Sequence, residues 1–223
     1  MILELSQVSL ADGGGKAVGL ARLVELGLPV PPAVVVPVGE ALDDPDAVIA
    51  RLGEPLAVRS SAVGEDAGDR SFAGQFETLL GVGRADLAAA VAHIRGATKR
   101  AESYGAGGPV AVVIQREVRA TRAGVAFSRD PVTNADEVLI ECALGGGEAV
   151  VSGEVTPDRY WVSSGGVRAR AAGALRTLRD DEASSVAELV RAAERGFGRP
   201  VDVEFCWEGR DLWLVQCRPI TTL

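Results

Sequence analysis

Short apolar runs bounded by glycine, proline and polar residues recur along the chain and indicate its fold class. Strand-like runs occupy residues 2–8, 34–36, 56–61 and 138–142, whereas helical spacing of apolar residues is clear at 18–26, 87–104 and 180–197. The pattern predicts an α+β protein with mixed and antiparallel sheets. The length of 223 residues suits one domain, 1–223, made of two lobes at approximately 1–108 and 109–223.

Three further pairs of strand-like runs are separated by turn residues, and each pair predicts a β-hairpin. The pairs are residues 110–118 with 124–128, 159–162 with 167–170, and 201–207 with 212–216. The third pair closes the chain and carries acidic and amide side chains.

Charge and cysteine content exclude several classes of protein. The formal net charge of −8 and the pI near 4.8 argue against a nucleic-acid partner, because phosphate backbones require clustered lysine and arginine. The three cysteines lack CxxC spacing and lie in apolar runs, so reduced buried thiols and a cytoplasmic setting are expected. Residues 1–10 do not resemble a secretion signal, and no apolar run approaches bilayer length. We therefore expect no membrane association.

A glycine-rich turn opens the first helical pattern. Lys16 follows Gly13, Gly14 and Gly15, an arrangement that lets the backbone approach a phosphate while the helix dipole and the ammonium group both favour negative charge. Taken alone, the pattern is more typical of a structural turn, and it is not a Walker motif. It becomes evidence for phosphate binding only in combination with the other motifs in the chain.

Two other places along the chain carry residues suited to phosphate and metal. Arg59 ends an apolar strand, where a guanidinium group can bind phosphate oxygens in bidentate fashion or form an ordinary surface ion pair. Glu204 lies inside an apolar strand, and its charge requires compensation by a cation or by hydrogen bonds. Gln216 and Arg218 occupy one face of the facing strand. Magnesium, or Arg218 alone, would supply the compensation.

Five segments in order resemble the nucleotide-binding domain of the phosphoenolpyruvate synthase, pyruvate phosphate dikinase and rifampicin phosphotransferase family. They are residues 13–20 with 28–32, 58–62 with 65–66 and 71–75, 113–118, 124–131 with 141–157, and 202–205 with 216–221. The resemblance covers nearly the whole chain. It implies an ATP-grasp fold, with two lobes around a nucleotide cleft, and ATP and Mg²⁺ as cofactors.

The resemblance also implies a set of site residues. Lys16 and Arg59 would contact the ATP phosphates, Arg129 would be a further phosphate contact, and Arg218 would lie beside the metal. A mobile loop would contribute Ser71, Gly74 and Gln75. Adenine would be bound by Gln115, Glu117 and Val118, and magnesium by Glu204 and Gln216.

Two departures from the family pattern affect the expected function. The segment between Val36 and Leu56 is shorter than is usual in the family, which could alter closure over the nucleotide. The chain also stops after the nucleotide-binding domain, so the swivelling domain with its phosphate-accepting histidine is expected on a separate protein. His93 lies in a helical pattern without any carrier motif and is expected to be structural.

The leading hypothesis is a magnesium-dependent phosphotransferase domain of the dikinase type, which passes a phosphoryl group from ATP to an acceptor on a separate protein or domain. Lys16, Arg59 and Arg218 would neutralise charge during transfer. Two alternatives remain open. One is a kinase that acts directly on a small molecule, with Glu148 or Asp130 as base, and the other is a non-catalytic nucleotide-binding module.

Overall fold

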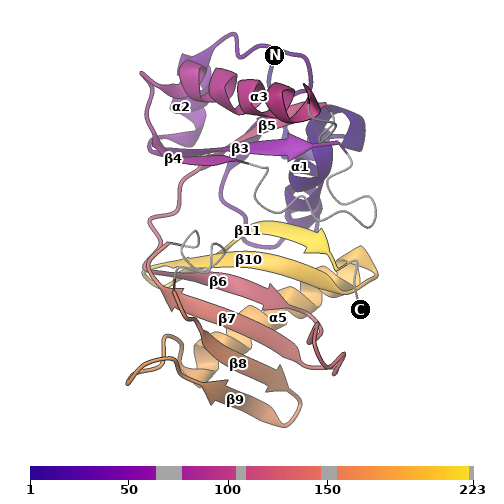
Figure 1. The fold of residues 1–223 in the computed structure, drawn as a ribbon, viewed down its shortest axis with the longest axis vertical. Helices are drawn as coiled ribbons and strands as arrows, with labels where there is room; N and C mark the ends of the chain where they lie inside the picture. The colour runs from indigo at the N-terminus through magenta and orange to yellow at the C-terminus, as the bar shows by residue number, and fades with distance from the viewer. Residues whose placement is uncertain (64–76, 104–108, 147–154, 221–223) are drawn as a thin grey trace. The chain divides into compact units, whose positions relative to one another are not determined.

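The computed structural model describes residues 1–63, 77–103, 109–146 and 155–220, and it divides into two compact units (Figure 1). Unit 1 contains residues 1–24 and 31–117, and unit 2 contains residues 25–30 and 118–223. The sequence suggested a division near residue 108. The units divide after Glu117 because the strand at 110–116 pairs within unit 1.

Unit 1 is built on a five-stranded sheet in the order β1-β2-β5-β3-β4. Its strands are β1 (Leu3–Glu4), β2 (Ala33–Val36), β3 (Leu56–Ala62), β4 (Thr78–Val82) and β5 (Val110–Arg116), and a short 3-10 helix, η1 (Leu5–Gln7), follows β1. The helices are α1 (Leu10–Glu25), α2 (Pro45–Leu52) and α3 (Leu87–Ser103). Valine and isoleucine dominate the central strands, as their preference for a pleated surface predicts.

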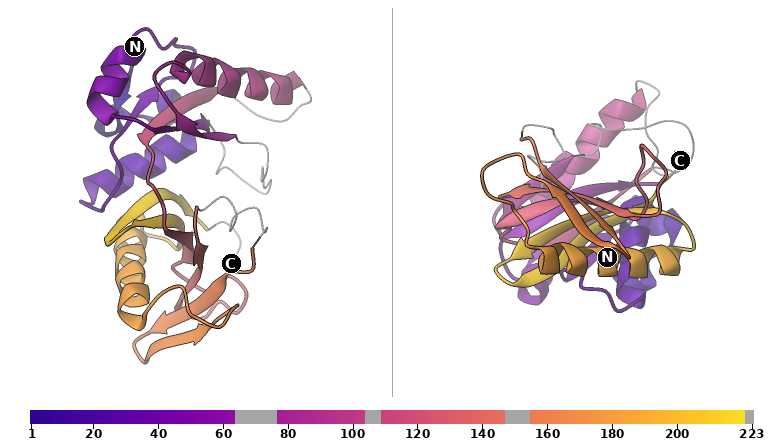
Figure 2. Two further views of the ribbon diagram at one scale, coloured as in Figure 1. Left: turned by 90° about the vertical axis from the view of Figure 1, so that its left-hand side faces the viewer. Right: turned by 90° about the horizontal axis from the view of Figure 1, so that it is seen from below.

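The two faces of this sheet are covered by different helices, α2 and α3 on one face and α1 on the other (Figures 1 and 2). The α2/α3 face forms an apolar core in which Val58, Ile94 and Ile114 are fully buried. The opposite face carries polar side chains from alternate positions of β3 and β5 and faces α1. Arg59, Ser61 and Gln115 therefore lie on the side of the sheet that α1 covers.

Unit 2 is built on a six-stranded sheet in the order β11-β10-β6-β7-β8-β9. Its strands are β6 (Arg122–Phe127), β7 (Val138–Leu144), β8 (Asp158–Ser163), β9 (Gly166–Arg170), β10 (Val201–Glu208) and β11 (Asp211–Pro219), and its helix is α5 (Asp180–Phe197). The helix crosses one face of the sheet (Figure 1). Val203, Phe205 and Tyr160 are fully buried at sheet positions on the side that α5 covers.

Two of the three expected hairpins are confirmed, and one is wrong. β8 pairs with β9, and β10 pairs with β11. The expected hairpin of residues 110–118 with 124–128 does not form, because β5 pairs with β2 and β3 in unit 1 whereas β6 pairs with β7 and β10 in unit 2. All strand pairs in the described ranges are antiparallel, so the mixed sheet expected from the sequence is not found there.

Local signals located α5 well. Its first turn contains Asp180, Asp181 and Glu182, and Gly198 ends it in the left-handed conformation. At its N-terminus, Glu182 accepts a hydrogen bond from the Arg179 N–H at 2.9 Å. The three cysteines are buried and free, as expected.

Candidate functional site

The glycine-rich turn breaks α1 at Gly14 and brings the following turn against β3. Gly14 has φ 72° and ψ 179°, a backbone conformation that residues other than glycine rarely adopt. A Cβ atom there would lie 2.4 Å from the Ser61 carbonyl oxygen and 2.7 Å from that of Ala62. Beyond the break, the Ala17 N–H donates to Ser61 Oγ at 3.1 Å. The helical segment that carries Lys16 therefore starts afresh at the end of β3.

Arg59, Ser61 and Gln115 lie on the same face of the unit 1 sheet, the face that α1 covers. The register pairs Ala57 with Gln115 and Arg59 with Val113, and side chains directly opposite each other share a face. The helix start that carries Lys16, the Arg59 guanidinium group and the Gln115 amide thus all lie on this side of the unit 1 sheet. The family resemblance implies that all three residues bind the nucleotide.

Gln115 is 2 % exposed, and its amide nitrogen donates to the Pro31 carbonyl oxygen at 3.2 Å. The bond ties β5 to the segment that enters β2. This amide nitrogen is therefore engaged within unit 1, and the predicted contact of Gln115 with adenine stays a prediction.

Glu117 and Val118 follow β5 where the chain passes from unit 1 to unit 2. The Glu117 N–H donates to the Pro55 carbonyl oxygen at 3.0 Å, and its carboxylate accepts from the Gly81 N–H on β4. Its side chain is thus bound to the sheet, so a contact with adenine would have to come from the backbone here. The Val118 N–H makes no hydrogen bond within the described ranges. Ser71, Gly74 and Gln75 lie outside the described residues.

Glu204 and Gln216 lie directly opposite each other on β10 and β11. The pairing depends on a β-bulge: Phe205 pairs with Leu214, so Val215 is an extra residue on β11. Bulges of this kind often re-aim side chains beside functional sites. Both side chains project from the face of the sheet opposite α5, since the alternate residues Val203 and Phe205 are the fully buried ones.

Arg218 is bound by a residue that the sequence did not identify, Asp202. Arg218 Nε and Nη2 each lie 2.9 Å from Asp202 Oδ2, and the two residues are opposite each other in the register. Asp202 is 8 % exposed. The pair adjoins Glu204 and Gln216 on the same face, so it holds the guanidinium group beside the two predicted metal ligands.

The donor set fits a hard divalent cation. A carboxylate and an amide oxygen are ligands that Mg²⁺ accepts, and this ion usually completes its shell with water and phosphate oxygens. No group of three or more His, Cys, Asp or Glu side chains suited to a metal occurs among the described residues. A metal at Glu204 and Gln216 would therefore depend on the nucleotide for further ligands.

Two other predicted groups are engaged in local structure. Arg129 donates to the Asn134 carbonyl oxygen at 3.2 Å, which ties it to the loop after β6. Asp130 is 4 % exposed and accepts hydrogen bonds from the Val132 and Thr133 N–H groups and from Trp161 Nε1. Burial raises the pKa of Asp130, but these bonds outweigh it and hold the pKa below its usual value.

His93 lies apart from the residues that carry the nucleotide motifs. Its Nε2 is 2.9 Å and 3.0 Å from the two carboxylate oxygens of Glu77, an interaction between α3 and the start of β4. The pair lines a groove whose other walls are mainly apolar, among them Leu79, Leu80 and Val82. His93 therefore contributes a contact between α3 and the start of β4.

Comparison with known proteins decides the family. Residues 38–174 and 166–223 match the family described as pyruvate phosphate dikinase, AMP/ATP-binding domain. This chain belongs to that family. It is 31 % identical to a probable phosphoenolpyruvate synthase of Methanothermobacter thermautotrophicus, over 99 % of this chain and 45 % of the relative. It is 37 % identical to a rifampicin phosphotransferase of Streptomyces sviceus, over 78 % of this chain and 24 % of the relative.

The pyruvate phosphate dikinase type domain thus spans less than half the length of these relatives. The alignment with the Methanothermobacter protein extends over 310 residues, so this chain of 223 residues is shorter than that relative within the matched region.

Solved structures confirm the ATP-grasp fold. An N5-carboxyaminoimidazole ribonucleotide synthetase in complex with ADP matches 94 % of this chain and 45 % of its own, with a TM-score of 0.56 and 10 % identity. A D-alanine–D-alanine ligase from Bacillus anthracis in complex with ATP matches 91 % of this chain and 52 % of its own, with a TM-score of 0.51 and 11 % identity. At these identities the likeness concerns the fold alone. Among the described helices, none is long and apolar enough to cross a membrane.

Proposed function

We propose that this domain binds ATP with Mg²⁺ and passes a phosphoryl group to an acceptor carried by a separate protein or domain. The observation that carries the proposal is the arrangement on β10 and β11. There Glu204 lies opposite Gln216, and Arg218 is fixed beside them by Asp202. The arrangement combines oxygen ligands for a cation with a guanidinium group for phosphate.

The family resemblance implies that residues of unit 1 also bind the nucleotide. Lys16, at the start of the helical segment after Gly14, and Arg59, on the sheet face that α1 covers, are suited to phosphate oxygens. The adenine ring would be bound by the segment from Gln115 to Val118, where the Val118 N–H is available as a donor. Arg129 and the loop residues Ser71, Gly74 and Gln75 remain proposed contacts from the family resemblance.

Transfer requires little covalent chemistry from the protein itself. The nucleophilic atom of the acceptor forms a bond to phosphorus as the bridging P–O bond breaks, and the leaving nucleotide takes the electron pair. Lys16, Arg59 and Arg218 would stabilise the negative charge that develops on the transferred and leaving oxygens. Bound Mg²⁺ would neutralise phosphate charge. Because ATP is the substrate, the proposal places the protein in the cytoplasm.

Calorimetric titration with ATP and Mg²⁺ tests the nucleotide site. Glu204→Ala and Lys16→Ala should each weaken binding by about tenfold or more, because each removes a charge-assisted interaction of roughly 1.5–3 kcal/mol. The matched control is Glu188→Ala, which removes an exposed carboxylate from α5 and should leave binding unchanged. Equal weakening in the control, or tight binding in both site variants, would contradict the site.

A transfer assay tests the acceptor. The chain is mixed with ATP labelled in turn at the β and γ phosphates, and with a separately produced phosphohistidine domain of a phosphoenolpyruvate synthase. Label should appear on the acceptor histidine, and the nucleotide product, ADP or AMP, identifies the phosphoryl group that moves. Absence of label on the acceptor, with ATP binding intact, would exclude a histidine acceptor of this type.

A small-molecule acceptor is the second candidate, since one relative is named a rifampicin phosphotransferase. Of the two bases considered for it, Asp130 is engaged in three hydrogen bonds, and Glu148 lies outside the described ranges. Consumption of ATP that depends on an added small molecule, without any phosphorylated protein, would favour this candidate.

A further inference from the structure

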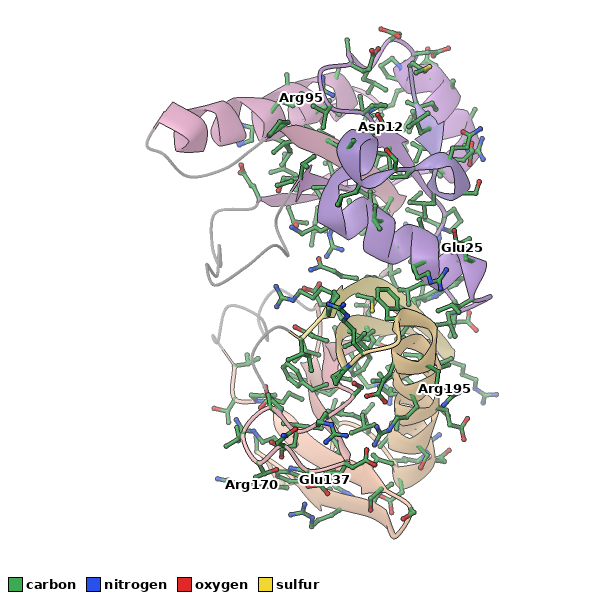
Figure 3. All side chains as sticks on the ribbon, turned by 90° about the vertical axis from the view of Figure 1, so that its right-hand side faces the viewer. Asp12, Glu25, Arg95, Glu137, Arg170 and Arg195 are labelled. Atoms are coloured by element: carbon green, nitrogen blue, oxygen red, sulfur yellow. The ribbon has the colours of Figure 1, made fainter. Side chains whose placement is uncertain are left out.

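The hairpin of β8 and β9, at one edge of the unit 2 sheet, carries a group of arginines. Arg159 on β8 and Arg168 and Arg170 on β9 are exposed, and Trp161 lies opposite Arg168. All four project from the face opposite α5, because Tyr160, between Arg159 and Trp161, is the fully buried residue. We call these four residues the arginine surface. Arg170 is labelled on this part of unit 2 in Figure 3, as is Glu137.

The arginine surface contains a pair of like charges in direct opposition. Arg159 pairs with Arg170 across the hairpin, and like charges in this position destabilise a sheet. An acidic residue at either position would instead form a favourable cross-strand pair, and the chain has more acidic than basic residues, 31 against 23. Glu141, opposite Arg159 on β7, compensates Arg159, whereas Arg170 adds a second positive charge on the other side of it.

Neighbouring groups hold two of the guanidinium groups in place. Arg159 Nε lies 2.7 Å from Glu141 Oε1, and Arg168 Nη2 lies 3.1 Å from Glu137 Oε1. Arg168 also lies over the Trp161 ring, 4.5 Å from its centroid. The Arg170 side chain has no ion pair or hydrogen bond within the described part of the chain. Two guanidinium groups are thus oriented, and a third is left for an external anion.

The arginine surface shares a row of side chains with the proposed metal ligands. The register runs from Gln216 through Glu204, Val125, Glu141 and Arg159 to Arg170. With about 4.8 Å between strands, Arg170 lies roughly 19 Å from Glu204 along the sheet. A small protein that covers about 800 Å² on its partner can span this distance.

We propose that the arginine surface docks an acidic segment of the protein that carries the phosphoryl acceptor. The proposal rests on the proposed function for the identity of the partner. Planar guanidinium groups on an open strand match the carboxylates of a partner's surface and accelerate encounter by electrostatic attraction. Nucleic acid is a poor fit, because a phosphate backbone requires more clustered cations than three arginines, two of which are paired with glutamates. The competing explanation is that these arginines prevent aggregation through the edge strand. That explanation predicts no binding of an acidic ligand.

Fluorescence anisotropy with a labelled oligoglutamate peptide tests the arginine surface on the full chain. The double variant Arg159→Ala with Arg170→Ala should weaken peptide binding at low ionic strength by about tenfold. The control double variant, Arg195→Ala with Arg199→Ala, removes two exposed arginines elsewhere and should bind the peptide like the native chain. Arg195 lies on α5 (Figure 3). Equal loss in both variants, or no binding by the native chain, would overturn the proposal.

A charge reversal separates docking from folding. Arg170→Glu creates an opposite-charge pair with Arg159, so it should raise the melting temperature while it abolishes peptide binding. A variant that is more stable yet binds the peptide normally would also overturn the proposal. ATP binding, measured on the same variants, should stay unchanged. If the native chain does not bind ATP, the proposed function alone is contradicted. If the native chain and the arginine variants bind the peptide equally, docking alone is contradicted.

Discussion

Gly14 shows how a single residue can set the geometry of a site. Its positive φ breaks α1, and the Ser61 and Ala62 carbonyl oxygens occupy the space that a side chain would need. We therefore predict that Gly14→Ala destabilises the protein by about 3 kcal/mol or more, because strain and a backbone clash act together. Unfolding in denaturant measures the change, and calorimetry should show loss of ATP binding in the fraction that stays folded.

Gly27 supplies the matched control for Gly14. It has φ 70°, but nothing lies within 4 Å of the position that a Cβ atom would take there. Gly27→Ala should cost only the strain of the left-handed conformation, about 1 kcal/mol, and should leave ATP binding intact. Equal losses in the two variants would show that contact with β3 plays no part at Gly14.

The sequence led to the prediction that Glu204 and Gln216 bind a metal, but it did not predict how the two residues come to lie opposite each other. A regular hairpin closed at Glu208 and Asp211 would place Val215 opposite Glu204, and Cys217 opposite Asp202. The bulge shifts this register by one residue and brings Gln216 and Arg218 to these positions. A bulge has no reliable local signature, so the interaction between Asp202 and Arg218 could not be found from the sequence.

At the scale of elements, sequence periodicity predicted most helices and strands correctly. It failed to predict strand pairing where the partner strands are distant in the sequence. The 18 residues of α5 were located because its charged first turn and final glycine lie within the segment itself. Residues 110–128 read as a hairpin because two strand-like runs flank a short turn. β5 instead finds its partners in β2 and β3, a choice made by tertiary packing.

Asp158 fixes the segment that leads from β9 to α5. Its carboxylate accepts from the Ala172 and Thr177 N–H groups, each at 2.6 Å, and from Tyr160 Oη at 3.2 Å. Burial raises the pKa of Asp158, but these bonds outweigh burial and keep the pKa below its ordinary value of 3.8. The folded protein thus favours the ionised form.

This lowered pKa predicts a pH-dependent contribution to stability. A carboxyl group whose pKa is lower in the folded state contributes its full stabilisation above the unfolded pKa, near 4, and loses it as the pH falls through the folded value. Asp158→Asn should therefore cost about 2 kcal/mol at pH 7, and the difference from the native chain should shrink below pH 4. The exposed Asp211→Asn should change stability by less than about 0.5 kcal/mol. A pH-independent difference for Asp158→Asn would contradict ionisation as its cause.

At the scale of the whole molecule, the proposed function requires both units to respond to one ligand. ATP with Mg²⁺ at about 100 times its Kd should stabilise the folded state by about 2.7 kcal/mol. Hydrogen exchange should then slow both near residues 14–17 and near residues 201–219. In Lys16→Ala the protection at residues 201–219 should be lost as well, although the substituted residue lies in unit 1.

Inorganic tripolyphosphate with Mg²⁺ is the control for this experiment. Because it lacks adenine, it should protect the two phosphate-binding regions but not the segment at residues 115–118. Protection by ATP that is confined to one unit would show that the two sets of residues do not act on a common nucleotide.

The short segment at residues 25–30 belongs to unit 2 although unit 1 surrounds it in the sequence. The Pro29 carbonyl oxygen accepts from the Leu214 N–H at 2.8 Å, and the Leu26 side chain fills the place where Gly196 has no Cβ. The gene therefore does not encode two consecutive modules. A fragment that starts at Val118 would lack residues 25–30, so a single proteolytic cut cannot release either unit intact.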